Sequence, residues 1–464
     1  MNIPAFATVA ELSDLLERRA FTPTDLLEET LARIERLEPV LNMFAFLDIH
    51  GARACAAAAD DRQRQGARRS PLDGIPTSIK DLIAQKGLPL RFGSRATPET
   101  PVAEDAPAVR RLREAGAVLL GKSTTSEFGC KAVGDSPLTG ITRNPWNPEM
   151  TPGGSSCGAA AMVAAGVVPY AIGTDGGGSI RIPAALSGLF GIKAHFGRVP
   201  VFPVSATPTL AHVGPLTRTV EDAAMVLGVI AGHDRRDPFS VAGPAPDYLE
   251  AARSRRKLRI GWSPDFGYAW VEPEVAALTA RAVERLARLG HEVEELPALM
   301  EDPVALWNAE FYAGVGTKLR GVIEQTPDLL DPAVLEVLRI AIAQEMGDYY
   351  ARVFERYAFR ETMRRLFERF DLLVSPTIPV SCVPAGRNVP ASQEGRSIVS
   401  WVAFTYPFNL TGQPAASMPV GFTEAGMPVG LQVVGAMHDE AAILSLCHGY
   451  EAAFGTLEHR PRLC

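Results

Sequence analysis

The chain has 464 residues, of which 47% are hydrophobic and 21% charged, and its formal net charge is −7. This length is enough for a large core, arranged as one large α/β domain or as about two to four smaller ones. The negative charge, without a long basic run, argues against a nucleic-acid-binding surface. The N-terminus lacks the pattern of a secretory signal, and the six cysteines are scattered without a CxxC pair. We therefore expect a cytoplasmic protein with neither a disulfide framework nor a zinc site.

The first part of the chain predicts helices followed by a strand and a helix–strand unit. Residues 8–38 have apolar positions at helical spacing and predict two amphipathic helices, and residues 51–65 predict a helix of small residues. Residues 74–81 are typical of a short strand, and a loop rich in Gly and Pro follows. Residues 107–124 predict an amphipathic helix, a turn at Gly116 and a buried strand.

Residues 150–174 contain no charged side chain, which raises the question of a membrane span. A transmembrane helix needs about 20 strongly apolar residues. This stretch is instead rich in Gly, Ala and Ser and is interrupted by Pro152 and Pro169. We expect no span here, but a helix buried on all sides in the interior of an α/β protein.

The second half of the chain returns to alternating strands and helices. Strands are predicted at 257–262, 291–297, 370–379, 415–422 and 427–435. The first two flank an amphipathic helix, and this alternation predicts an α/β fold with a substantially parallel sheet. Residues 303–370 are mostly helical in pattern and are expected to form an insertion or lid near the pocket.

The stretch GAVLLGKS (116–123) matches the phosphate-loop pattern GxxxxGK[ST]. In that motif the four variable residues form a loop after a strand. Here they are apolar, are themselves the predicted strand, and follow a helix. We interpret the stretch as a buried strand with a turn, and nucleotide binding as the disfavoured alternative.

The stretch GSSCG (154–158) matches the nucleophile-elbow pattern GxSxG around Ser156. Such an elbow needs a strand before the serine and a helix after it. The preceding segment contains Pro145, Pro148 and Pro152 and is not a strand, and none of the downstream histidines has a distinctive context. A nucleophile elbow is therefore also the disfavoured interpretation.

The stretch GTDGGGSIR (173–181) places three glycines, Gly176, Gly177 and Gly178, directly before Ser179. Successive glycine amides can turn their N–H groups into one concave anion site. If Ser179 attacked a carbonyl carbon, these donors would stabilise the oxyanion that forms. The flanking Asp175 and Arg181 would hold the turn by hydrogen bonds. The alternative is a glycine-rich turn that binds nothing.

A serine nucleophile needs a base, and Lys80 follows the strand-like run GIPTSI. A lysine at the end of a buried strand is poorly solvated, which lowers its pKa from about 10.4. That pKa must fall by several units for the amine to act as a base near neutral pH. The alternative for Lys80 alone is an ordinary surface lysine.

These residues together resemble the amidase signature family of Ser–Ser–Lys hydrolases. The core of that family is similar to TPGGSSCGAAAMVAAGVVPYAIGTDGGGSIRIPAALSGLFGIKAHFGRV (151–199), and PLDGIPTSIKD looks like its lysine motif. The segments GKSTTSEFG, TRNPWNP, FDLLVSPTIP and NLTGQPAASMPVGF also look like family segments, so the likeness covers most of the chain.

The resemblance implies a role for each residue of the core motif. Ser179 would be the acyl-forming nucleophile, Ser155 would carry protons between Ser179 and Lys80, and the Gly154–Ser155 peptide bond would be cis. The three glycines, with the Ser179 amide, would form the oxyanion hole. Supporting positions are expected at Ser156, Thr174, Asp175 and Arg181.

The resemblance also implies the architecture and the partners. We expect an α/β amidase signature fold, with a large mixed, twisted sheet covered by helices on both faces. The chain would be a single domain, 1–464, with N-terminal helices in 1–65, a catalytic core in 66–200 and the helical insertion in 303–370. We expect no metal or cofactor, a small-molecule amide as substrate, a homodimer as the assembly, and neither nucleic acid nor a membrane as partner.

The sequence departs from the family pattern at two places. Cys157 stands where the family usually has glycine, and Ala194 and His195 replace the familiar Pro-Thr. We interpret Cys157 as a small buried residue that crowds the loop beside Ser155, and the change at 194–195 as lying outside the chemistry.

The predicted function is hydrolysis of a carboxylic acid amide to a carboxylate and ammonia or an amine. The alternative is the glutamine-hydrolysing component of a tRNA-dependent amidotransferase, against which Ile182 stands where that subfamily usually has glutamine. A catalytically silent binding protein is a third class, disfavoured because all three triad positions are filled.

The pocket is expected to be lined by the 125–131 loop, by part of 303–350 and by the stretch 400–412. In the last of these, the aromatic residues Trp401, Phe404, Tyr406 and Phe408 would favour an aromatic or aliphatic acyl group, or would pack in the core instead.

Overall fold

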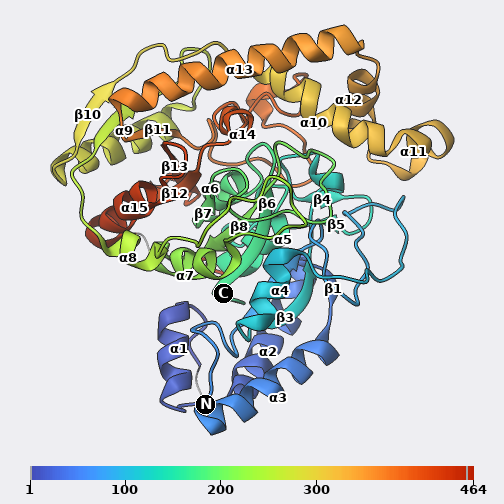
Figure 1. The fold of residues 1–464 in the computed structure, drawn as a ribbon, viewed down its shortest axis with the longest axis vertical. Helices are drawn as coiled ribbons and strands as arrows, with labels where there is room; N and C mark the ends of the chain where they lie inside the picture. Colours follow the sequence, from blue (N-terminus) through green and yellow to red (C-terminus); the bar gives the residue numbers. More distant parts are fainter. Residues whose placement is uncertain (1–2, 456–457, 464) are drawn as a thin grey trace.

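An eleven-stranded sheet runs through the computed structural model, which describes residues 3–455 and 458–463 (Figure 1). In spatial order its strands are β1 (Phe44–Leu47), β3 (Val118–Ser123), β2 (Pro76–Lys80), β6 (Tyr170–Asp175), β8 (His212–Thr217), β7 (Phe190–Lys193), β12 (Ala415–Phe422), β13 (Pro428–Gly435), β11 (Leu372–Pro376), β9 (Arg259–Trp262) and β10 (Glu292–Glu295). A separate small hairpin is formed by β4 (Asp135–Ser136) and β5 (Gly140–Ile141).

The sheet is mixed, which confirms the predicted fold class. Parallel pairing joins β3, β2 and β6 near one end, and β11, β9 and β10 at the other. From β6 through β8, β7, β12 and β13 to β11, neighbouring strands are antiparallel. The expectation of a substantially parallel sheet is therefore wrong for the centre. Parallel neighbours need a helical crossover, whereas β7 leads to β8 and β12 leads to β13 through segments without a helix.

Helices cover both faces of the sheet because alternate strand residues point to opposite sides. Leu119 and Ile172 belong to one hydrophobic cluster, whereas Leu120 and Ala171 belong to another. Helices of the first cluster are α1 (Val9–Glu17), α4 (Pro107–Glu114), α7 (Val220–Ile230), α8 (Tyr248–Arg253), α9 (Pro273–Arg288) and α15 (Glu440–Phe454). Helices of the second are α2 (Pro23–Leu41), α3 (Ile49–Gln65) and α5 (Cys157–Ala164).

The N-terminal helices begin where the sequence predicts. Thr8 and Thr22 each accept a hydrogen bond from the amide three residues on, and Glu11 and Asp25 in turn accept one from the threonine amide. These reciprocal capping boxes satisfy amides that have no partner within the helix. They set the first residues of α1 and α2.

Helix α5 is buried along its whole length, as the small residues of this stretch predict. All eight of its residues are buried. A Cβ added at Gly158 would overlap the carbonyl oxygen of Met43 and lie 2.6 Å from the amide of Thr124. The helix therefore packs directly on backbone. No helix among residues 3–455 and 458–463 is both long and apolar enough to cross a bilayer.

Residues 304–369 form helices that lie across one end of the molecule, at the top of Figure 1. They are α10 (Val304–Lys318), α11 (Arg320–Gln325), α12 (Pro332–Ile342) and α13 (Met346–Arg369). Trp307, Phe311 and Tyr312 of α10 belong to a third hydrophobic cluster with residues of α6 (Arg181–Ser187), such as Ile182. The remaining helix, α14 (Pro407–Thr411), and the short 3-10 turns η1 (Glu127–Gly129), η2 (Pro327–Leu329) and η3 (Ala391–Gln393) lie in connecting segments.

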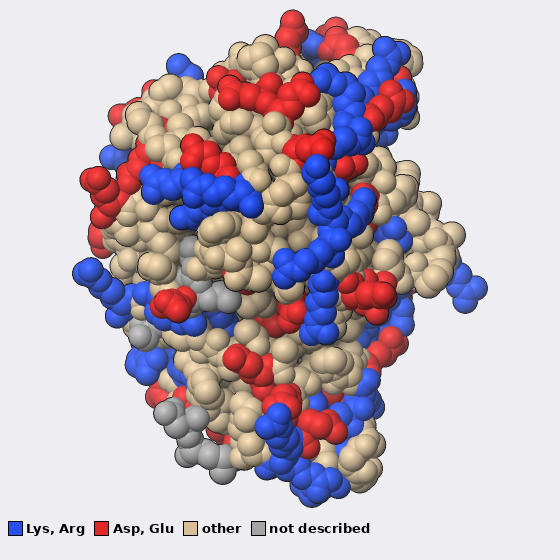
Figure 2. All heavy atoms as spheres, turned by 90° about the vertical axis from the view of Figure 1, so that its left-hand side faces the viewer, with Lys and Arg blue, Asp and Glu red and all other residues tan. Residues whose placement is uncertain are grey.

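Acidic and basic side chains are interspersed over the face of the molecule in Figure 2. On α13, for example, Arg364 bonds to both Glu361 and Glu368. Exposed pairs of this kind contribute about 0–1 kcal/mol each. They are ordinary features of a solvated surface.

Candidate active site

Five segments bring the predicted site residues together. Lys80 is the last residue of β2, and Thr174 and Asp175 end β6, its parallel neighbour. The ends of parallel strands meet at one edge of a sheet, so these side chains are close. Ser155 and Ser156 directly precede α5, and the glycine turn with Ser179 lies between β6 and α6.

The amine of Lys80 contacts three hydroxyl groups. Its side chain is fully buried, and Nζ lies 2.7 Å from Ser155 Oγ, 2.9 Å from Ser156 Oγ and 2.9 Å from Thr174 Oγ1. Burial lowers the pKa of Lys80 to about 7, because the charged form loses its hydration; the thiol of Cys157 and the carboxylate of Asp175 oppose this only in part. At neutral pH a large fraction of this amine is therefore unprotonated.

The hydroxyl of Ser156 is committed to structure. It donates to the carbonyl oxygen of Thr174 at 3.3 Å and accepts from the amide of the same residue at 3.3 Å. Its side chain is fully buried, and no strand precedes it. The GxSxG match is therefore not a nucleophile elbow.

Ser155 and Ser179 line the same cavity. The Gly154–Ser155 peptide bond is cis, as the resemblance implies. A Cβ at Gly154 would overlap the carbonyl oxygen of Val133, so only glycine fits there. Among the described residues no hydrogen bond joins the two serine hydroxyls, and Ser179 Oγ has no protein partner.

The three glycines of the turn differ in what their amides bind. The N–H of Gly178 donates to Asp175 Oδ1 at 2.7 Å. Within residues 3–455 the amides of Gly176, Gly177 and Ser179 donate to no protein acceptor. The carbonyl oxygens of Gly176 and Gly177 accept bonds from Trp307 Nε1 (2.8 Å) and Thr405 Oγ1 (2.6 Å). The expectation of equal roles for all three glycines is therefore too simple, because Asp175 takes the Gly178 amide.

Asp175 and Arg181 form a fully buried ion pair beneath this turn. Arg181 Nε and Nη2 each lie 2.9 Å from one oxygen of Asp175. Burial would raise the pKa of the Asp175 carboxyl, but the attraction and hydrogen bonds of Arg181 outweigh it and hold the pKa well below its usual range. The other guanidinium hydrogens go to Thr405 O, Gln432 Oε1 and Asn409 Oδ1, so all five donors are satisfied.

Several of these supporting residues were not predicted. Trp307, Thr405, Asn409 and Gln432 lie far from the glycine turn in the sequence. Asn409 falls in the segment NLTGQPA, which the resemblance marks as a family segment, and this was the one available signal for it. The contact of Trp307 with Gly176 has no signal in the sequence, because it depends on how α10 packs.

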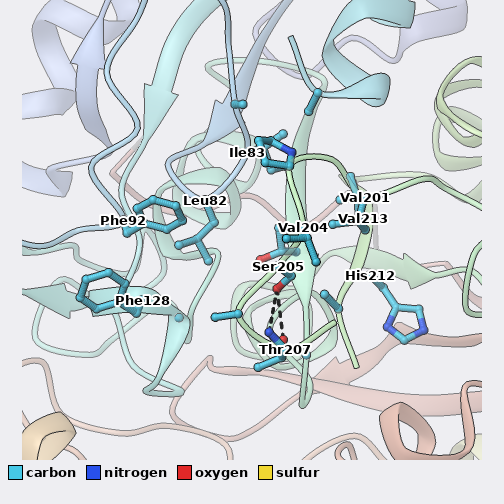
Figure 3. Close-up of a pocket in the computed structure, with 18 of the residues that line it drawn as sticks. Leu82, Ile83, Phe92, Phe128, Val201, Val204, Ser205, Thr207, His212 and Val213 are labelled. Atoms are coloured by element: carbon cyan, nitrogen blue, oxygen red, sulfur yellow. Dashed lines mark hydrogen bonds between the residues drawn. The ribbon is translucent and has the colours of Figure 1, made fainter. Parts of the chain in front are cut away.

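A cavity of about 250 Å³ opens over Ser155 and Ser179 (Figure 3). As expected, the 125–131 loop contributes Phe128 and Gly129 to its lining, and α10 contributes Phe311 and Val315. The segments 82–92 and 200–207, which the prediction omitted, supply much of the remaining wall. The cavity is mainly apolar in its side chains.

The expected contribution of residues 400–412 to the lining is wrong. Trp401, Phe404, Tyr406 and Phe408 are at most 1% exposed and belong to hydrophobic clusters rather than to the cavity wall. Of the two interpretations left open for them, core packing is therefore correct. From this stretch, Thr405 reaches the site through the carbonyl of Gly177.

Lys122, the lysine of the phosphate-loop match, lies within β3 and is buried. Its amine donates to the carbonyl oxygen of Ile83 and lies 3.5 Å from Asp81 Oδ1. The residues between Gly116 and Lys122 include a strand rather than a phosphate-binding loop. The interpretation as a buried strand is confirmed.

The two departures from the family pattern are also buried. Cys157 Sγ lies 3.5 Å from Thr124 Oγ1, and burial raises the pKa of its thiol. His195 Nδ1 lies 2.7 Å from Glu440 Oε1, and its side chain does not line the cavity. Neither residue presents a reactive group to the cavity.

A sequence model of the Amidase family matches residues 25–444. The chain belongs to the amidase signature family. Members of this family act on linear carbon–nitrogen amide bonds, so the chain is an amidase-type hydrolase. Among curated relatives, it is 37% identical to a glutamyl-tRNA(Gln) amidotransferase component of Chloroflexus aurantiacus, over 98% of each chain. It is 33% identical to an acylamidase of Rhodococcus erythropolis, over 98% of this chain and 97% of that one.

The fold is similar to that of solved amidase signature enzymes. A bacterial aryl acylamidase of this family superposes with a TM-score of 0.91 and 29% identity, over 97% of this chain and 96% of that chain. The match extends over nearly the full length, so the large mixed sheet with its helices is the amidase signature fold.

Proposed function

We propose that this amidase signature protein hydrolyses an amide through an acyl-enzyme on Ser179, with Ser155 as proton carrier and Lys80 as base. The observation that carries the proposal is the buried amine of Lys80, with a pKa of about 7, only 2.7 Å from Ser155 Oγ. Ser156 gives its hydrogen to Thr174 and can only accept from Lys80. An unprotonated amine that donates to Ser156 and Thr174 directs its lone pair at Ser155.

The reaction then follows in balanced steps. Lys80 takes the proton of Ser155 while Ser155 takes that of Ser179, and Ser179 Oγ bonds to the amide carbon. The amides of Gly176, Gly177 and Ser179, which have no protein acceptor among residues 3–455, donate to the oxyanion. The proton returns through Ser155 to the leaving nitrogen, the carbon–nitrogen bond breaks, and water hydrolyses the ester along the same path.

Alanine substitutions test these roles. We expect Ser179→Ala and Lys80→Ala to lower kcat/KM for phenylacetamide by at least about a thousandfold, because each removes a group that acts in the transition state. The matched control is Lys86→Ala, an exposed lysine away from the cavity, which should retain the wild-type rate. A folded Ser179→Ala or Lys80→Ala protein with wild-type turnover would refute the proposal.

The second candidate is the glutamine-hydrolysing component of a tRNA-dependent amidotransferase, which the names of the curated relatives favour. Glutamine carries an α-ammonium and an α-carboxylate that need charged partners. In the cavity lining the charged residues are Asp175, which Arg181 already pairs, and Lys318, whose amine donates to Val204 O at 3.0 Å. This supports a stand-alone amidase. In the same assay we expect L-glutamine to release ammonia at least about tenfold more slowly than phenylacetamide, and the opposite order would favour the amidotransferase.

A further inference from the structure

Two Phe–Gly pairs in the cavity wall share an unusual backbone conformation. Phe92 and Gly93 have φ values of +54° and +65°, and Phe128 and Gly129 have +49° and +72°. The left-handed region is routine for glycine but rare for a bulky residue such as phenylalanine. Such conformations persist where the surrounding structure imposes them and often mark functional sites.

Hydrogen bonds hold both pairs in place. The N–H of Phe128 donates to the carbonyl oxygen of Phe92 at 2.8 Å, and the N–H of Phe92 donates to that of Asp81 at 3.1 Å. The N–H of Gly93 donates to Asp81 Oδ2 at 3.3 Å. Asp81 directly follows Lys80, so one stretch of chain carries the proposed base and anchors the turn of Phe92.

The result is a pair of rings presented to the cavity beside the proposed proton carrier. The ring centroids of Phe92 and Phe128 are 5.7 Å apart with an interplanar angle of 22°. A Cβ added at Gly129 would lie only 3.2 Å from Ser155 Oγ, which places this wall directly against Ser155. In Figure 3 the two rings and Leu82 lie on one side, and Val201, Val204 and Val213 lie opposite.

Core packing alone does not account for this pair. Phenylalanines that only fill space in this protein, such as Phe404 and Phe408, are fully buried. Phe92 and Phe128 are instead only half-buried, and both line the cavity. Their rings therefore offer free aromatic surface to whatever occupies it.

We propose that Phe92 and Phe128 form a binding site for an aromatic ring, so that the substrates are uncharged amides with an aryl group. This inference rests on the proposed function. A substrate ring stacks on, or packs edge-to-face against, these phenylalanines, and the opposing valines enclose its other side. The apolar lining excludes charged substituents, because they would lose hydration without gaining a partner.

Two matched pairs of substrates test the proposal. Phenylacetamide and hexanamide differ in the acyl half, and N-benzylacetamide and N-hexylacetamide differ in the amine half. We expect wild type to have a higher kcat/KM for the aryl member of at least one pair. In that pair, Phe128→Leu and Phe92→Leu should lower the aryl-to-alkyl ratio about three- to tenfold, the range of an aromatic contact. Phe128→Tyr, which retains the ring, should keep the ratio.

The control is Phe354→Leu on α13, where the side chain is 70% exposed, and it should keep the wild-type ratio. If Phe128→Leu does not fold, Phe92→Leu and Phe128→Tyr carry the test. Wild type that prefers neither aryl substrate, or leucine variants with an unchanged ratio, would overturn the inference while amide hydrolysis stands. Failure of the proposed function would instead appear as Ser179-independent turnover of all four amides.

Discussion

Lys80 owes its proposed chemistry to the kind of groups that surround it. Its amine contacts three hydroxyls, whereas a carboxylate at the same distance would stabilise the ammonium form and raise the pKa. The nearby carboxylate, Asp175, is instead bound by Arg181 in a bidentate pair. Burial therefore dominates and the pKa of Lys80 falls to about 7.

This environment predicts the pH dependence of the reaction. Below the pKa of Lys80 the amine is protonated and cannot accept a proton, so kcat/KM should rise with pH up to about 7 and level off above it. The measurement is a pH–rate profile with a neutral amide, whose own charge does not change in this range. A rate that is highest below pH 5 and falls as pH rises would contradict the assignment of Lys80 as base.

At the scale of elements, close approach of backbones places the serines beside the lysine. Helix α5 packs on the segments of Met43 and Thr124 through Gly158, which holds its N-terminal end, with Ser155 and Ser156, against β2 and β6. A larger residue at this position would push the helix away. Small side chains in α5 therefore serve the geometry of the site as well as packing.

A pair of glycine-to-alanine substitutions tests this explanation. Gly158→Ala would place a methyl group against the carbonyl oxygen of Met43, and we expect it to destabilise the protein by about 1–3 kcal/mol. Gly228 in α7 is exposed with no atom near its added Cβ, so Gly228→Ala should stabilise by about 0.5–1 kcal/mol. Urea unfolding measures both. Equal effects of the two substitutions would contradict the close-approach argument.

At the scale of the whole molecule, residues distant in sequence converge at one edge of the sheet. Lys80, Ser155 and Ser179 come from the parallel end of the sheet, whereas Trp307 comes from the helices at the top of Figure 1. The bond from Trp307 to Gly176 joins these helices to the glycine turn. The position of α10 therefore contributes to both the cavity wall and the orientation of the proposed oxyanion donors.

Local signals in the sequence predicted much of this arrangement. The motifs around Lys80, Ser155 and Ser179 pointed to residues that are indeed neighbours, and the small residues of 150–174 correctly predicted a buried helix. Hydrophobicity alone could not decide whether Trp401 and Phe404 face the cavity or the core. Strand direction between β7 and β13 and the positive φ of Phe92 and Phe128 depend on tertiary contacts, which no local pattern reports.

Trapping the acyl-enzyme tests the central claim most directly. The protein is mixed with the p-nitrophenyl ester of phenylacetic acid, quenched in acid within the first turnover, and mapped by peptide mass spectrometry. The account predicts one phenylacetyl group on the peptide that contains Ser179, and none there in Ser179→Ala. A phenylacetyl group on Lys80 or on a cysteine, with Ser179 unmodified, would contradict it.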